Sequence, residues 1–295
     1  MELEALLVAE RERIDGVLDR VLPPAGAWPE RLHAAMRYAV FGGGKRVRPV
    51  LVRAASRAAG GNPEHVVEAA CAIELVHTYS LIHDDLPALD DDTLRRGRPT
   101  VHVAYDEALA ILAGDALLTE AFAVLGAFPA GEEYAARRAE ACRLVADAIG
   151  SRGMVGGQVE DLEATGGVPD AARLDRIHRA KTGALIGAAV ELGALLAGVD
   201  GPRRRAFATF GQRLGLLFQV ADDILDVTGS AASLGKSPGK DAAAGKLTYP
   251  AVFGLDAANR ALEALAEALT REAEGIEGRG GTLGALVGYV ARRDR

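Results

Sequence analysis

The chain gathers carboxylates into two short clusters. Six aspartates form them: Asp84, Asp85, Asp90, Asp222, Asp223 and Asp226. Each cluster follows an apolar segment with helical period, where a folded protein has no structural reason to concentrate negative charge. Converging carboxylates repel one another unless cations lie between them. Oxygen ligands without His or Cys suit Mg²⁺, which shares its coordination shell with water and phosphate groups. The clusters therefore predict a Mg²⁺-dependent enzyme that acts on a phosphorylated substrate.

The first cluster contains a proline that changes its geometry. On a regular helix, Asp84 and Asp90 would point about 120° apart. Pro87 cannot continue a regular helix and disfavours helical geometry at the residue before it. We therefore expect the helix to end near Asp85 and the chain to turn, so that Asp84 and Asp90 reach one metal ion. The alternative, a solvated acidic helix end, would oppose the helix macrodipole without compensation.

The second cluster lies on a helix face that also carries glycines. Asp222 and Asp226 are four residues apart and share this face, which Gln219, Gly215 and Gly211 continue. Two interpretations stay open for the glycines. They leave either a slot beside the helix that is wide enough for an apolar tail, or a surface against which a second helix packs closely.

Basic residues accompany both clusters. Arg95 and Arg96 follow the first cluster directly, and guanidinium groups suit bidentate binding of an anion. His77 lies two helical turns before the same cluster. Lys45 and Arg48 follow three consecutive glycines where a helix is expected to begin, a second plausible anion site.

The segment that follows the second cluster is rich in Gly, Ala and Ser. It extends from Gly229 to Gly245, contains Lys236 and Lys240, and is followed by Lys246. We expect it to act as a lid that closes over phosphate oxygens. A plain solvated loop is the alternative.

The elements that position these residues are helical. Apolar residues recur with helical period nearly everywhere, and strand alternation is almost absent. Proline and glycine predict helix boundaries at 3–21, 29–41, 49–59, 63–85, 103–127, 132–163, 170–199, 202–228, 247–271 and 281–293. No repeat or long linker divides them. We expect one all-α domain over residues 1–295, with a broad central cavity.

Composition excludes several classes of protein. A net charge of −7 over 295 residues gives no basic surplus for a nucleic-acid partner. Cys71 and Cys142 lie in apolar surroundings, as buried free thiols do in a reducing compartment. The amino terminus lacks the pattern of a signal peptide. The longest apolar run, 183–199, contains Glu191 and is short for a bilayer span. We expect a cytoplasmic protein without a membrane span.

Five segments in this order resemble the trans-isoprenyl diphosphate synthases, or polyprenyl synthetases, and most closely the bacterial farnesyl diphosphate synthases. They are GGKRVRP at 43–49, YSLIHDDLPALDDD at 79–92, LRRG at 94–97, KT at 181–182 and FQVADDILD at 218–226. The resemblance covers nearly the whole chain. It implies a bundle of antiparallel helices around a deep cavity, usually as a homodimer.

The resemblance also implies an activity. Members of this kind join isopentenyl diphosphate head-to-tail to dimethylallyl and geranyl diphosphate, by Mg²⁺-assisted ionisation, condensation and proton loss, and yield farnesyl diphosphate. A geranyl or geranylgeranyl diphosphate synthase of the same family is the alternative. Tyr79 lies five residues before Asp84, about 7.5 Å lower along the helix, where its ring would act as a floor for the growing tail; Ser80 beside it would not. In the family, an aromatic residue at this position accompanies a C15 product.

Residue roles follow from the same match. The ligands of three Mg²⁺ would be Asp84, Asp90 and Asp222, with direct or water-mediated contacts from Asp85, Asp223 and Asp226. The allylic diphosphate would be held by Arg95, Lys181 and Lys236, with Lys246 nearby. Isopentenyl diphosphate would be held by Lys45, Arg48, His77 and Arg96. Thr182 and Gln219 would face the developing allylic cation. The chain departs from the usual family pattern at Thr93 and Glu160, and neither residue is a proposed ligand.

Three other functions compete with this interpretation. His83-Asp84 is an HD pair of the kind that HD phosphohydrolases use, but that reading leaves Asp90 and the second cluster without a role. A terpene cyclase carries a single aspartate-rich motif with a different second metal motif, and it needs no Lys45 site. A non-catalytic partner subunit should have lost its metal motifs, and both are whole here.

Overall fold

The computed structural model describes residues 3–229 and 245–292. They form two compact units. The first comprises residues 1–53 and 63–142, and the second comprises the described parts of 54–62 and 143–295. The expectation of one domain stays a prediction.

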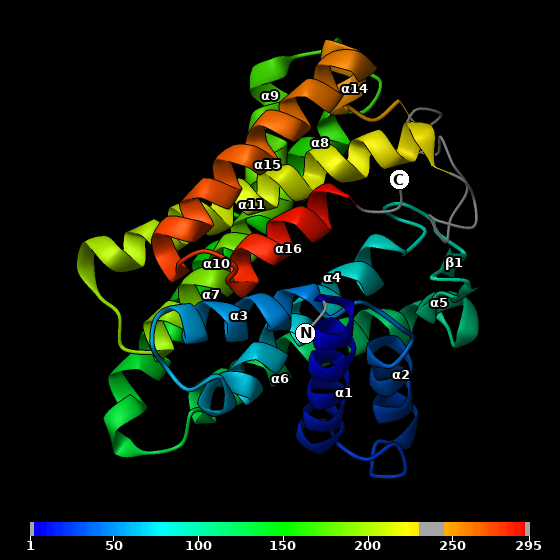
Figure 1. The fold of residues 1–295 in the computed structure, drawn as a ribbon. Helices are drawn as coiled ribbons and strands as arrows, with labels where there is room; N and C mark the ends of the chain where they lie inside the picture. The colour runs from blue at the N-terminus through cyan, green and yellow to red at the C-terminus, as the bar shows by residue number, and fades with distance from the viewer. Residues whose placement is uncertain (1–2, 230–244, 293–295) are drawn as a thin grey trace. The chain divides into compact units, whose positions relative to one another are not determined.

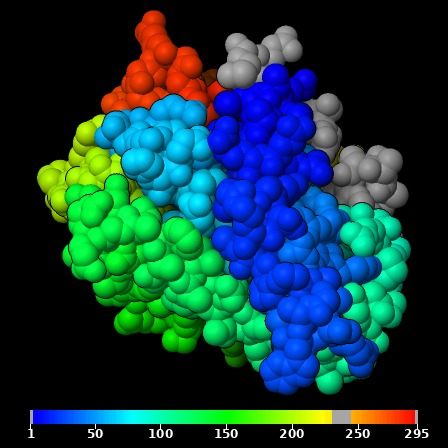
Figure 2. All heavy atoms as spheres, turned by 90° about the horizontal axis from the view of Figure 1, so that it is seen from below, coloured from blue at the N-terminus to red at the C-terminus, as the bar shows by residue number. Residues whose placement is uncertain are grey.

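The first unit is built around α4. Its elements are α1 (Leu3–Val21), α2 (Glu30–Val40), most of α3 (Val47–Ala58), η1 (Pro63–Val66), α4 (Val67–Asp84), β1 (Leu94–Arg95), β2 (Arg98–Pro99), α5 (Val101–Ala104), α6 (Glu107–Ala127), η2 (Glu132–Tyr134) and the first half of α7 (Ala135–Ile149). Most residues of α4 are buried, because α1, α2 and α6 all pack against it (Figure 1). Side chains of α1 and α2 lie together on the surface, in the darkest blues of Figure 2.

The apolar helix α6 is long enough and hydrophobic enough to cross a membrane, judged by length and composition alone. It packs against α4, α2 and α5 as a core helix does. Gly114 gives α4 its closest approach, since a Cβ there would lie 2.2 Å from His83 Nε2. Ile111 and Leu112, on the same helix, remain 44% and 55% exposed.

The second unit contains the remaining helices. They are α8 (Met154–Ala164), α9 (Ala171–Ile177), the π-helix η3 (His178–Gly183), α10 (Ala184–Leu196), α11 (Gly201–Thr228), α14 (Tyr249–Phe253), α15 (Leu255–Glu277) and α16 (Thr282–Ala291). α10 and α11 pack along each other, and α15 packs against α11 and α16 (Figure 1).

Glycines decide how closely η3 and α10 approach α11. A Cβ on Gly215 would lie 2.5 Å from Gly183 Cα, and a Cβ on Gly211 would lie 2.9 Å from Gly187 Cα. Both distances are shorter than real carbon contacts. The glycine face of α11 is therefore filled by a neighbouring helix, and the interpretation of this face as an open slot for an apolar tail is wrong.

Two predicted helices are divided at glycines. Residues 132–163 form α7 and α8, because the chain turns at Gly153, where a Cβ would lie 2.0 Å from Ala148 O. The predicted helix 247–271 breaks at Gly254, whose φ is +81°, and its second part continues to Glu277. Both breaks fall where only glycine fits the backbone.

Candidate active site

The chain turns back on itself directly after α4. Asp85 caps the helix, and the N–H of Asp90 donates to the carbonyl of Asp84 at 2.9 Å. The N–H of Asp92 donates to the carbonyl of Asp85 at 3.2 Å. The turn expected from Pro87 is thus present, and it brings the backbones of Asp84 and Asp90 into contact.

The donors at this turn fit Mg²⁺ in their chemistry. Asp84 and Asp90 are half-buried carboxylates, and carboxylate oxygen is the protein ligand that Mg²⁺ prefers. Within residues 3–229 and 245–292, no three His, Cys, Asp or Glu side chains are grouped closely enough to hold a metal ion. A small number of protein ligands is typical of Mg²⁺ that fills the rest of its coordination shell with phosphate oxygens.

Asp85 is paired with Arg95. It is 3% exposed, and Arg95 Nε donates to its Oδ1 at 3.0 Å and its Oδ2 at 3.3 Å, while Arg95 Nη2 also bonds Oδ1. Arg95 Nη2 reaches Asp92 Oδ2 at 3.5 Å as well. Burial raises the pKa of Asp85, although Arg95 acts in the opposite direction. Asp85 therefore holds the side chain of Arg95, which is predicted to bind the allylic diphosphate.

A cationic environment surrounds His77 on α4. Burial, followed by the charges of Arg48 and Arg96, lowers the pKa of His77 well below its usual value. The imidazole is consequently neutral, and the arginine charges that act on it are those of Arg48, Arg96, Arg95 and Arg46. Such an environment favours an incoming anion, so three residues predicted to hold isopentenyl diphosphate act on one another here.

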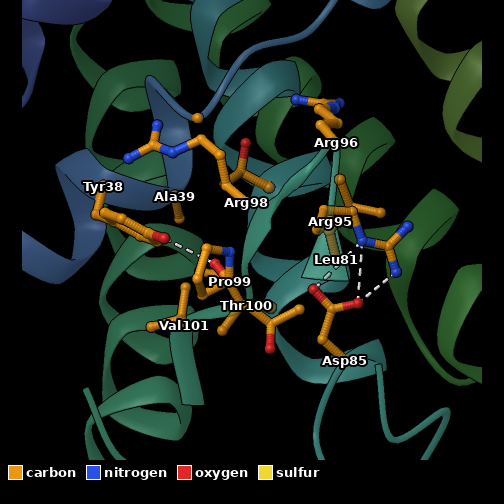
Figure 3. Close-up of a pocket in the computed structure, with 13 residues that line it drawn as sticks. Tyr38, Ala39, Leu81, Asp85, Arg95, Arg96, Arg98, Pro99, Thr100 and Val101 are labelled. Atoms are coloured by element: carbon orange, nitrogen blue, oxygen red, sulfur yellow. Dashed lines mark hydrogen bonds and ion pairs between the residues drawn. The ribbon is translucent and has the colours of Figure 1, made fainter. Parts of the chain in front are cut away.

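The glycine-rich turn and the arginine pair also meet. Arg95 and Arg96 lie on a hairpin that the sequence did not predict, in which β1 pairs with β2 (Figure 3). Arg96 Nη1 donates to the carbonyl of Gly43. A Cβ on Gly44 would lie 2.6 Å from Arg96 Nη1. A side chain at this position would displace the guanidinium of Arg96.

Arg46, between Lys45 and Arg48, has a role that the sequence did not reveal. It is 3% exposed, and its guanidinium pairs with Glu74 at 2.9 Å and Asp15 at 2.7 Å. Its Nη2 also donates to the carbonyl of Val40 at 2.7 Å. Arg46 therefore anchors the turn from inside. Lys45 is exposed and Arg48 half-buried on either side of it.

The predicted tail-floor residue lies inside the first unit. Tyr79 is 6% exposed, and its ring meets that of His83 edge-on at 5.7 Å. Burial, with the charge of Asp84, raises the pKa of Tyr79 to about 12. Ser80 donates to the carbonyl of His77 at 2.9 Å. His83 Nε2 lies 3.1 Å from the carbonyl of Ile111 on α6, a packing role that the HD-phosphohydrolase reading does not require.

In the second unit, the π-helix carries Lys181 and Thr182. Single π-helical turns inside α-helices occur frequently at functional sites. Lys181 Nζ pairs with Asp161 Oδ2 at 2.7 Å. A Cβ on Gly157 would lie 2.3 Å from Lys181 N, so glycine lets α8 reach the turn. Asp161 belongs to the sequence GGQVED at 156–161, and its pairing was not predicted.

A chain of hydrogen bonds joins the other predicted residues of this unit. Thr182 Oγ1 donates to Gln219 Oε1 at 2.7 Å, and Gln219 Nε2 donates to Asp223 Oδ1 at 2.9 Å. The other oxygen of Asp223 accepts from the N–H of Tyr249 at 2.7 Å and lies 3.1 Å from His178 Nε2. Asp223 is thus an orienting group, and sequence reasoning missed His178.

The remaining members of the second cluster differ in exposure. Asp223 and Asp226 are 4% and 2% exposed, whereas Asp222 is half-buried. Asp222 has the most accessible carboxylate of the three, as its assignment to a metal requires. Lys246 is half-buried. Lys236 and Lys240, with the predicted lid, lie outside the described residues.

The sequence matches the polyprenyl synthetase family over residues 29–278. It is 40% identical over 294 residues to the farnesyl diphosphate synthase of Geobacillus stearothermophilus, covering 100% of this chain and 99% of that protein. It is 46% identical over 268 residues to the chloroplastic geranylgeranyl pyrophosphate synthase of Capsicum annuum, covering 90% and 72%.

Solved structures agree with this match. A FPP/GFPP synthase from Zymomonas mobilis superposes with a TM-score of 0.83 at 36% identity, covering 98% of this chain and 97% of that one. A geranyltransferase from Helicobacter pylori, complexed with magnesium and isoprenyl diphosphate, gives 0.85 at 30% identity, covering 98% and 96%. The chain belongs to the polyprenyl synthetase family, and the all-α isoprenoid-synthase fold is confirmed. It is an enzyme of the trans-prenyltransferase class.

Proposed function

We propose that this enzyme condenses isopentenyl diphosphate head-to-tail with dimethylallyl and then geranyl diphosphate, giving farnesyl diphosphate. One observation carries the proposal. The helix α4 presents the acidic turn at Asp84 and, seven residues earlier, His77 among arginines. Seven residues span about 10 Å of helix. The proposal therefore assigns a metal-dependent anion site and a metal-free anion site to one helix, a separation that suits a reaction between two bound diphosphates.

The charges of the predicted residues fit this chemistry. Six carboxylates bring about −6 and three Mg²⁺ bring +6, so the charge of the allylic diphosphate falls to basic side chains. We assign these to Arg95, Lys181, Lys236 and Lys246. Isopentenyl diphosphate is assigned to Lys45, Arg48, His77 and Arg96. Arg95 and Lys181 each have a carboxylate partner, Asp85 and Asp161, that holds the side chain in place before the substrate arrives.

Mg²⁺ held by Asp84, Asp90 and Asp222 would supply Lewis-acid stabilisation of the departing diphosphate. The chain itself orients the groups near the reacting carbon. Because a buried carboxylate polarises the hydrogen bonds that lead away from it, Asp223 directs Gln219 and, through it, Thr182. This polarisation increases electron density on the Thr182 oxygen, which suits a group that faces an allylic cation. Proton loss from the new tail is assigned to the departed diphosphate as base.

Product length is proposed to depend on Tyr79. The buried Tyr79 ring and the His83 ring beside it form a bulky pair on α4. Tyr79 lies five residues before Asp84, and His83 directly precedes it. A farnesyl product is favoured because a ring at this depth leaves room for a short tail. A geranylgeranyl product is the alternative, since the chain is similar to enzymes of both names.

A homodimer is proposed as the working form. Ile111 and Leu112 leave an apolar surface on α6 that core packing does not cover. A second copy would remove this surface from water, which contributes roughly 25 cal/mol per Å². Light scattering tests the assignment, and a monomer at micromolar concentration would contradict it.

A single assay tests the activity. Dimethylallyl, geranyl and farnesyl diphosphate are each incubated with labelled isopentenyl diphosphate and Mg²⁺, and the products are sized by chromatography. We expect C15 from the first two primers and little extension of the third. Mainly C20 or longer products would refute the farnesyl assignment. Orthophosphate release from nucleotides without any prenyl product would refute the prenyltransferase proposal itself.

A further inference from the structure

The hairpin that carries Arg95 and Arg96 is too small to fix its own geometry. Each strand contains two residues, with Leu94 paired to Pro99 and Arg95 paired to Arg98. Short isolated hairpins are marginally stable in water. The turn consists of Arg96 and Gly97, with φ of +54° and +76°. A non-glycine residue in this region is strained, so contacts from outside must hold the hairpin.

Packing beneath the hairpin is interrupted by a pocket. A pocket of about 450 Å³, open to solvent, undercuts it (Figure 3). Its lining includes Thr78, Leu81 and Ile82 of α4, with Val101 beyond the hairpin. The pocket leaves part of the hairpin without core packing beneath it, so side-chain contacts contribute to its position.

Two of the contacts that hold the hairpin are made by Arg95 and Arg96, the side chains proposed to bind diphosphate. Arg95 is bound to Asp85, and Arg96 to the carbonyl of Gly43. A diphosphate that recruits both guanidinium groups competes with these contacts. In the proposed function, substrate binding would weaken both contacts at the moment when the arginines must be held most accurately.

A third contact holds the hairpin without involving the guanidinium of Arg95 or Arg96. The hydroxyl of Tyr38, at the carboxyl-terminal end of α2, donates to the carbonyl of Pro99 at 2.7 Å (Figure 3). The guanidinium of Arg98 lies over the Tyr38 ring, 4.4 Å from its centroid. Tyr105 packs edge-on against the same ring at 5.7 Å. Tyr38 thus contacts the second strand of the hairpin twice, from a ring held independently of its hydroxyl.

We propose that Tyr38 is a positioning residue that holds the Arg95–Arg96 hairpin while both arginines bind diphosphate. The proposal rests on the proposed function, in which these arginines bind the two substrates. Tyr38 reaches neither guanidinium through its hydroxyl, so it acts through the backbone of Pro99. Its loss weakens substrate binding and leaves the chemical step close to unchanged.

The variant Tyr38→Phe tests this, because it removes one hydrogen bond and keeps the ring beneath Arg98. Losing one such bond corresponds to about a three- to tenfold change in binding. We expect KM for both diphosphate substrates to rise by that factor while kcat stays near the wild-type value. The matched control is Tyr134→Phe. Among residues 3–229 and 245–292, the Tyr134 hydroxyl has no hydrogen-bond partner, and KM should not change.

A second variant and a double-mutant cycle distinguish a positioning role of Tyr38 from a general effect on stability. Arg98→Met breaks the stacking contact but keeps the Tyr38 hydrogen bond, and it should raise both KM values in the same direction. In an Arg96→Lys background, Tyr38→Phe should raise KM for isopentenyl diphosphate less than it does in the wild type. Additive effects in this cycle, or wild-type KM values in Tyr38→Phe, would overturn the proposal.

A binding measurement makes the two proposals separately testable. Calorimetry with inorganic pyrophosphate reports the affinity of the arginines without turnover. Weaker pyrophosphate binding by Tyr38→Phe than by Tyr134→Phe supports the positioning role even if the wild type forms no prenyl product. Equal affinities of the two variants, in an enzyme that does form product, would refute the positioning role alone.

Discussion

The guanidinium of Arg95 bonds both carboxylate oxygens of Asp85, with Nε 3.0 Å from Oδ1 and 3.3 Å from Oδ2. This pair separates Asp85 from Asp84, although the two are adjacent in the sequence. Asp85 is buried and occupied by a cation, while Asp84 is half-buried at the point where the chain turns back. Adjacent carboxylates of one motif therefore differ in burial.

Asp84→Asn and Asp85→Asn should consequently fail in different ways. Asp84→Asn removes a metal ligand, and we expect turnover to fall by about two to three orders of magnitude, as for loss of a transition-state contact. Asp85→Asn releases Arg95, and we expect mainly a higher KM for the allylic diphosphate. Steady-state kinetics with circular dichroism for folding measures both. Asp256→Asn, at an exposed aspartate of α15, is the control. Near-wild-type turnover of Asp84→Asn at saturating Mg²⁺ would refute the metal assignment.

His77 predicts a pH dependence of stability. Its pKa in the fold is depressed well below the usual value of about 6.5. As pH falls below about 6.5, the unfolded chain binds a proton that the folded chain does not, so the free energy of unfolding falls. Denaturant unfolding between neutral and mildly acidic pH should show this loss, and His77→Gln should reduce it. Bound pyrophosphate adds negative charge and should raise the pKa of His77, which NMR titration measures. An unchanged imidazole titration with pyrophosphate would place the anion elsewhere.

Gly44 tests the contact between the glycine-rich turn and Arg96. A Cβ there would meet the guanidinium at 2.6 Å, and φ is +138°. Gly44→Ala should therefore displace Arg96 and raise KM for isopentenyl diphosphate, besides costing about 1–3 kcal/mol of backbone strain. Gly60→Ala is the control, because Gly60 has φ of +90° and nothing within 4 Å of its Cβ position. It should lose stability without a change in KM. Equal KM values for both variants would contradict the contact.

The helical fold was predictable because buried faces recur with a 3.6-residue period, which is a local property of the sequence. The breaks in that fold were less accessible. The apolar pattern continues through Gly153, where steric exclusion of a Cβ divides α7 from α8. The hairpin at 94–99 has strands too short to show alternation.

The aspartate clusters and basic residues were predictable because their chemistry is written in residue type and spacing. Their partners were not, because pairing depends on tertiary contact. Nothing local distinguishes Arg46, turned inward to Glu74, from Arg48 two residues later. Asp161 and His178 likewise acquire their roles only from Lys181 and Asp223.

Tyr79 predicts how product length should change. Tyr79→Ala removes a buried ring on α4 and leaves space below Asp84, so the product should lengthen from C15 toward C20. Product chromatography measures the shift. Ser80→Ala, at the adjacent position, should leave the distribution unchanged, since within the described part of the chain Ser80 bonds only the His77 carbonyl on its own helix. A C15 product from Tyr79→Ala would assign the floor to another residue.

Gly215 joins the packing of the second unit to its chemistry. A Cβ there would lie 2.5 Å from Gly183 Cα, the last residue of the π-helix that carries Lys181 and Thr182. Gly215→Ala should therefore push the π-helix away from α11, costing about 1–3 kcal/mol of overpacking. Because Gln219 lies one turn further along α11, the Thr182 hydrogen bond should lengthen and kcat should fall. Gly126→Ala, in α6 with open space at its Cβ position, should instead stabilise the fold by up to about 1 kcal/mol. Thermal unfolding and kcat of the two variants test this prediction, and a Gly215→Ala enzyme with wild-type stability would show that η3 and α11 are not in close contact.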